Sequence, residues 1–211
     1  MPALRTPPSL GLVLAAVTLS ACAAPAPAQK APVPQPLMTA ALAGTAVIVV
    51  PSTMVVADPG LPAGSLPSER SQVLAWADSV VAAALQERAP EVTWVLPAEL
   101  RRVARRSVGL VADPDQMGQA VLRQTSLRTV PDPLRSHLRN LMAVAGGGRH
   151  AFVPAAVVVA PAQGGGVRVV LSAVLADGRS GAISWRTEAE ATGDTPSVAL
   201  AAALAAILPV L

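Results

Sequence analysis

Two kinds of hydrophobic periodicity alternate along the chain and predict a domain that contains both helices and strands. Apolar residues recur every three or four positions over residues 68–88, a spacing typical of an amphipathic helix. Over residues 167–176 they occupy every second position, which is typical of a strand with one buried face. The expected strands are residues 45–56, 92–96, 150–160, 167–176 and 182–187, and the expected helices are residues 68–88, 97–108 and 196–208, with two more beginning at 114 and 133.

Capping and turn residues set the expected boundaries of these elements. Asp113, Pro114 and Gln116 combine a capping acid, a first-turn proline and a glutamine at the third helical position, which is typical of a helix start. The connectors at 161–166 and 177–181 are short and rich in glycine, as in tight hairpins. This order predicts an α/β (α+β) fold: a single mixed sheet with a late antiparallel meander and helices packed on it. We expect it to occupy residues 43–211.

The N-terminus has the organisation of a bacterial lipoprotein signal. Arg5 precedes an apolar run of about ten residues, which is too short to span a bilayer. The run ends in Leu19, Ser20, Ala21 and Cys22, a sequence that resembles the lipobox. In a lipobox the cysteine accepts a diacylglyceryl group and becomes the first residue after cleavage. We therefore expect residues 1–21 to be a signal peptide and Cys22 to carry the lipid; the alternative is an ordinary secretory signal with a chance cysteine.

A proline-rich stretch follows the cysteine. Residues 23–37 contain five prolines, which favour extended polyproline geometry over helix or sheet. We expect residues 22–42 to be a tether that holds the domain up to roughly 45 Å from the membrane. The alternative for this stretch is a ligand for a proline-recognition module. Because Ala23 and not Asp follows the cysteine, we expect the periplasmic face of the outer membrane, if the cell has one.

Composition narrows the possible functions. The chain is 52% hydrophobic, which supplies a real core, and its net charge is only +3, or +2 without residues 1–21. That small positive charge is weak evidence for a polyanionic partner. Because we expect the protein to be exported, we expect no nucleic-acid partner. A single cysteine excludes an intramolecular disulfide and a cysteine-based metal cluster.

Motifs for catalysis do not assemble in this sequence. The glycines at 146–148 lack the Gly-Lys-Ser/Thr of a phosphate loop, so turns explain them better. Asp113 and Asp115 match part of a calcium loop, but a methionine and a glutamine stand where oxygen ligands are required, so helix capping explains these acids. His137 and His150 form a poor zinc set without cysteine. We expect no cofactor, no metal and no enzyme; the alternative is an enzyme that processes envelope polymers.

Four arginines are the candidate binding residues. Arg101, Arg102, Arg105 and Arg106 fall on one predicted helix, at spacings that form a contiguous face. The plain interpretation is a solvated helix face. The sharper hypothesis is a surface for an acidic partner, which could be an envelope protein, peptidoglycan carboxylates or anionic lipid, since guanidinium groups bind carboxylates in a bidentate manner.

Residues 175–185 have the pattern of a strand, an Asp-x-x-Ser/Thr-Gly turn, and a strand ending in Trp. This pattern resembles a family of bacterial envelope lipoproteins that includes the curli secretion-channel subunit, the penicillin-binding-protein activators and the N-terminal domain of TolB. Residues 153–159 resemble an adjacent strand, although Pro154 departs from the pattern, and residues 97–102 resemble the helix after the second strand. The matching stretch runs from about residue 45 to residue 208.

The resemblance implies a lipid-anchored interaction or assembly module of the cell envelope. Its partner would be an envelope protein, and a homo-oligomer is possible. The chain lacks the long hairpins that a curli-type pore needs and the propeller that follows this domain in TolB. The shared motifs are packing and turn features, so they indicate the fold more strongly than the function.

Overall fold

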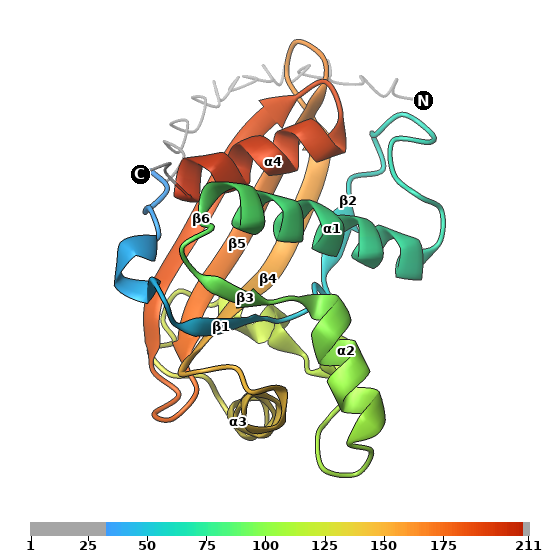
Figure 1. The fold of residues 1–211 in the computed structure, drawn as a ribbon. Coiled ribbons are helices and arrows are strands. Elements are labelled where there is room, and N and C mark those ends of the chain that lie inside the picture. Colours follow the sequence, from blue (N-terminus) through green and yellow to red (C-terminus); the bar gives the residue numbers. More distant parts are fainter. Residues whose placement is uncertain (1–32, 209–211) are drawn as a thin grey trace, which may run out of the picture. The chain divides into compact units, whose positions relative to one another are not determined.

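A computed structural model describes residues 33–208 of the chain. Its centre is a six-stranded mixed sheet in which β1, β3 and β2 run parallel to their neighbours and β4, β5 and β6 form an antiparallel meander. The order is β3-β1-β4-β5-β6, with β2 paired to the far part of β4 (Figure 1). The predicted fold class is therefore confirmed. The strands are β1 (Ala46–Val49), β2 (Val55–Ala57), β3 (Thr93–Val95), β4 (His150–Pro161), β5 (Val167–Asp177) and β6 (Ile183–Gly193).

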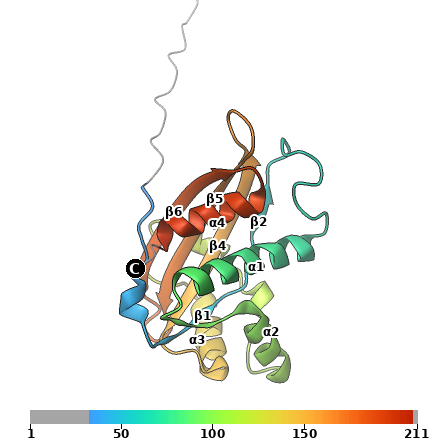
Figure 2. The same ribbon diagram turned by 45° about the horizontal axis from the view of Figure 1, so that its top comes forward.

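Helices pack on both faces of the sheet. Helices α1 (Arg70–Arg88) and α4 (Pro196–Ile207) lie side by side over one face, as both views of the ribbon show (Figures 1 and 2). Helices α2 (Pro97–Arg106) and α3 (Leu134–Ala145) pack with the opposite face. The short 3-10 helices are η1 (Thr39–Leu42), η2 (Pro114–Gln116) and η3 (Gln119–Arg123).

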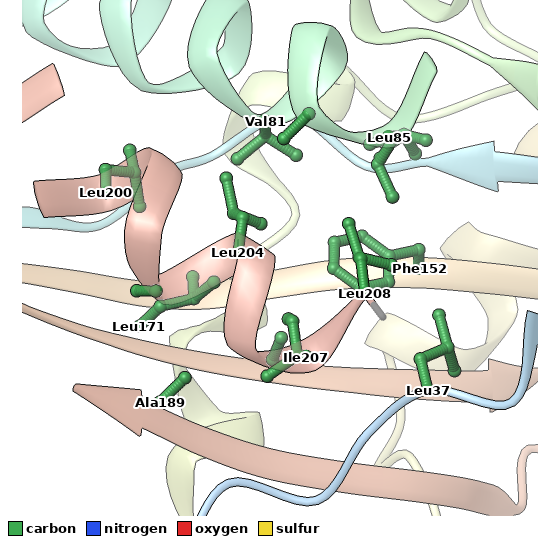
Figure 3. Packing of buried hydrophobic residues seen from close by; sticks show 14 of the residues in the cluster. Leu37, Val81, Leu85, Phe152, Leu171, Ala189, Leu200, Leu204, Ile207 and Leu208 are labelled. Atoms are coloured by element: carbon green, nitrogen blue, oxygen red, sulfur yellow. The ribbon is translucent and has the colours of Figure 1, made fainter. Parts of the chain in front are cut away.

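The face under α1 and α4 holds the larger core. The alternating residues of β5 all lie in this cluster, as the period of two predicts: Val167, Val169, Leu171, Ala173 and Leu175. Leu200, Leu204 and Ile207 of α4 are fully buried against the sheet and α1 (Figure 3). Helix α4 is apolar almost all round, and its burial between sheet and helix explains that composition.

Several element boundaries differ from the prediction. The strand expected over residues 45–56 is two strands, because the chain leaves the sheet at Pro51 and the backbone N–H of Ser52 donates to Asp78. The helix expected from residue 114 is only the short turns η2 and η3, because Gly118 takes a left-handed φ of +72° between them. Strand β6 runs six residues past the expected end, since Ala189 continues the buried alternation between exposed glutamates.

The packed domain also begins earlier than residue 43, where we expected it to start. Leu37 is only 3% exposed and its N–H donates to the carbonyl of Ile207 at 2.7 Å. The indole N–H of Trp185 donates to the carbonyls of Gln35 and Pro36, both at 3.1 Å. The last prolines of the expected tether therefore belong to the domain, because an apolar leucine beyond them fills a gap beside α4. Cys22 and the expected signal peptide lie outside the described residues.

Candidate interaction surface on helix α2

The four arginines of α2 divide into one buried side and one exposed side. Leu100 fixes the orientation of the helix, because it is fully buried in the core beneath. Next to it, Arg101 turns inward and is held by two carboxylates. Its Nη2 donates to Asp78 at 2.5 Å and to Asp115 at 2.7 Å, and its Nε donates to the two oxygens of Asp115 at 2.9 and 3.0 Å.

Burial makes this ion pair part of the structure. The side chain of Asp78 is 7% exposed and accepts a further hydrogen bond from the backbone N–H of Ser52 at 2.6 Å. Removal from water raises the pKa of Asp78, against the opposing effect of the bonds from Ser52 and Arg101. Hydrogen bonding to Asp115, and then to Asp78, raises the pKa of Arg101 further above its ordinary value. Arg101 is therefore held by the fold and is less exposed than Arg102, Arg105 and Arg106, although its expected role in partner binding stays a prediction.

The other three arginines remain as the candidate surface. Arg102, Arg105 and Arg106 are exposed, and among residues 33–208 none of them makes an ion pair. Helix α2 has ten residues, and Arg105 and Arg106 lie in its last turn. The three side chains therefore cover the outer side of α2 and its C-terminal end. We call these three residues, with Val108 and Leu110 described next, the α2 surface.

Two exposed aliphatic side chains adjoin these arginines. Val108 is 84% exposed and Leu110 is 71% exposed, in the turn directly after α2 at the lower right of Figure 1. The turn is ordered by a hydrogen bond from the N–H of Leu110 to the carbonyl of Ser107 at 3.0 Å and by a bridge between Val108 and Val111. Gly109 supplies the left-handed φ of +82° that the turn requires.

Sequence reasoning missed these two residues. The available signal was a pair of branched apolar residues on either side of a glycine, directly after a strongly charged helix. Our expected helix ran through residue 108 and so absorbed Val108 into a regular element. The structure ends α2 at Arg106, and the two side chains then point outward because the turn carries them away from the core.

The α2 surface combines charge with apolar contact area. Three guanidinium groups offer bidentate sites for carboxylates, and two aliphatic side chains offer area that gains free energy when covered. A hollow of about 430 Å³ lies alongside, lined by Arg105, Val108 and Val111 among others. The carboxylate of Asp113 accepts from the N–H of Asp115 at 3.0 Å, as the capping explanation of that acid predicts.

The described residues do not bring together a metal-binding set. Between Val33 and Leu208 there is no group of three or more His, Cys, Asp or Glu side chains that could hold a metal ion. In the same part of the chain, no helix has both the length and the apolar character needed to cross a membrane.

Comparison with known proteins leaves the family of this chain open. Neither models of protein families nor curated proteins match it. Remote likenesses to solved structures include LpoB of Escherichia coli (15% identity, 92% of this chain and 84% of that chain, TM-score 0.38) and lipoprotein GNA1162 of Neisseria meningitidis (17%, 70% and 79%, 0.36). Another is PelC of Paraburkholderia phytofirmans, solved as a dodecamer (13%, 78% and 86%, 0.33). At these identities and TM-scores the likenesses carry no inference about function.

Proposed function

We propose that this protein is a lipid-anchored, non-catalytic interaction module of the bacterial cell envelope, and that its α2 surface captures an acidic protein partner. The observation that carries the proposal is the α2 surface itself. Three arginines without ion pairs in the described chain adjoin two aliphatic residues that are 84% and 71% exposed. Isolated exposed apolar residues are common, but a cluster framed by charge on an ordered turn is typical of a docking surface.

The division within α2 supports a docking role. Arg101 fixes α2 to α1 through Asp78 and to η2 through Asp115, so the outer side of α2 is presented on a rigid base. A rigid surface loses little conformational entropy on binding. An acidic partner would satisfy the three guanidinium groups, while its apolar residues would cover Val108 and Leu110.

Anchoring through Cys22 would hold this surface near the membrane. Because Leu37 and Gln35 belong to the packed domain, a tether that begins at Cys22 would be shorter than the sequence suggests. The eleven residues from Ala23 to Val33 would reach roughly 34 Å in polyproline geometry. The partner would then lie on, or close to, the same membrane, on the periplasmic face of the outer membrane if the cell has one.

The anchor has a direct test. Cys22→Ser removes the lipid acceptor and leaves the domain intact, so the variant should leave the membrane fraction and lose radiolabelled fatty acid. Membrane retention with continued labelling would contradict the proposed anchor.

The partner surface has a matched test. A photoactivatable crosslinker at Val108 should capture an envelope protein in living cells, and Arg105→Gln with Arg106→Gln should reduce that capture severalfold. The control, Arg139→Gln with Arg179→Gln, removes the same charge from exposed positions elsewhere and should leave capture unchanged. Equal capture by both variants, or adducts only with phospholipid or peptidoglycan, would contradict a protein partner at this surface.

A further inference from the structure

A second hollow lies on the sheet face opposite α4 and is independent of the α2 surface. Its volume is about 360 Å³, and the parts of β5, β6 and η3 that line it come from residues far apart in the sequence. Its apolar lining includes Val33, which is 85% exposed, whereas Leu122 and Val174 are at most 1% exposed and offer a ligand almost no surface. The polar lining includes Ser172, Thr125 and two arginines, Arg123 and Arg186.

Arg186 differs from Arg101, another half-buried arginine of the domain. Arg101 has two carboxylate partners, but Arg186 donates only to backbone carbonyls: from Nη1 to Leu122, and from Nη2 to Leu127 at 3.2 Å. Within residues 33–208 no carboxylate pairs with it. Burial, followed by repulsion from Arg128, lowers the pKa of Arg186. The guanidinium therefore occupies a place where its charge lacks compensation.

The unused donors of Arg186 can serve a ligand. A guanidinium has five N–H donors, and the two bonds to carbonyls leave about three of them. Arg123 adds a second positive charge and Glu188 one negative charge among the lining residues, so the hollow keeps a positive surplus. The hydroxyls of Ser172 and Thr125 add donors that suit an oxygen ligand.

We propose that this hollow binds a short peptide through its free terminal carboxylate, with the carboxylate at Arg186 and Arg123 and a small aliphatic side chain against Val33. Carboxylates match the planar donors of guanidinium groups, and the exposed apolar side chain of Val33 favours an aliphatic body over a bare inorganic anion. The volume lies within the range of small-ligand sites.

The test is a titration of the detergent-solubilised mature lipoprotein, followed by amide chemical shifts. The probes are acetyl-Ala-Ala with a free carboxylate, the same peptide with a terminal amide, and inorganic phosphate. The carboxylate peptide should cause saturable shifts at Ser172 and Thr125. The amide should bind at least tenfold more weakly, and so should phosphate. Equal binding of carboxylate and amide, no saturable shift, or a preference for phosphate would each overturn the proposal.

Variants separate the ligand contact from a structural role. Arg123→Gln should weaken binding severalfold, and Glu188→Gln should tighten it, because it removes the one negative charge of the lining. Arg168→Gln is the control, since Arg168 lies on the same sheet but pairs with Glu190 at 3.3 Å. Arg186→Lys keeps a charge that can cap the two carbonyls, and it should weaken binding while the protein stays folded. Affinity that is insensitive to both Arg123→Gln and Glu188→Gln would contradict the site.

Discussion

The two sides of helix α2 use the same residue type for opposite purposes. Arg101 faces inward, where Asp78 and Asp115 hold it, whereas Arg102, Arg105 and Arg106 face outward without an ion pair in the described chain. The sequence shows four arginines on one helix, and their spacing alone does not separate them. The difference comes from Asp78 on α1, which is 23 residues away and reaches α2 only in the folded structure.

This contrast teaches how a charged cluster should be interpreted. A guanidinium matched with buried acids contributes to the fold, and its removal leaves a buried charge without a partner. A guanidinium in solvent contributes little to the fold and remains available for a partner. The number of acids brought within reach by other elements, and not the number of arginines, decides between the two roles.

The largest expected effect comes from breaking the inward side. Asp78→Ala removes one partner of Arg101 and the acceptor of the Ser52 N–H, so it should lower the free energy of unfolding by about 3 kcal/mol. Urea denaturation measures this change. Glu87→Ala, an exposed carboxylate on the same helix, is the control and should change stability by less than about 0.5 kcal/mol. Equal effects of the two substitutions would remove the distinction between the sides of α2.

A contrast between a buried and an exposed residue also divides the N-terminal segment, where Leu37 is buried and Val33 is exposed. Leu37→Ala should destabilise the domain by about 2 kcal/mol because Leu37 is 3% exposed within the core beside α4 (Figure 3). Val33→Ala, at a position 85% exposed, should be neutral. Thermal unfolding of the two variants decides whether the domain begins before residue 37. Neutral behaviour of Leu37→Ala would return this segment to the tether.

The fold was predictable from sequence where periodicity was strong. The alternating residues of β5, the apolar stripe of α1 and the Thr195-Pro196 start of α4 act locally, so a window of sequence contains the information. Thr195 indeed caps α4 by accepting from the N–H of Val198 at 3.3 Å. Leu37 was missed because its burial depends on Ile207 and Trp185, which lie about 150 residues or more along the chain.

The candidate site was predictable only in part. The sequence identified the arginines as a group, but the role of Arg101 depends on acids from two other elements. Val108 and Leu110 were hidden because helix ends are poorly defined by propensity alone. Arg186 gave no sequence signal, since its environment is made by Leu122 of η3 and by Leu127, which follows η3.

The carboxylate of Asp177 extends the comparison between paired and unpaired charges, because its pKa is lowered whereas that of Asp78 is raised. Hydrogen bonds from the Ser180 N–H first, then from Arg149 and the Arg179 N–H, hold the pKa of Asp177 well below its usual range. A lowered pKa in the folded state means that its stabilisation is present at neutral pH and is lost as the pH falls below about 4. Asp177→Asn should cost about 1.5 kcal/mol at pH 7 and less at pH 3. A cost that is constant from pH 7 to pH 3 would contradict this origin.

The smallest expected effect on stability comes from the outward side. Arg102→Gln, Arg105→Gln and Arg106→Gln together should change the free energy of unfolding by less than about 0.5 kcal/mol. Guanidinium chloride should be avoided as denaturant here because its ionic strength screens surface charge, so urea is used. A loss of 2 kcal/mol or more would show that these residues, like Arg101, serve the fold.

The most direct test of the central claim is salt-dependent capture at the α2 surface. Isolated membranes carrying a photoactivatable crosslinker at Val108 are irradiated at rising ionic strength, with and without Arg105→Gln and Arg106→Gln. An acidic protein partner predicts a single protein adduct that decreases as salt rises and decreases again with the arginine substitutions, because screening weakens exposed charge contacts. An adduct whose yield depends on neither salt nor the arginines would contradict the proposal that this surface recognises an acidic partner.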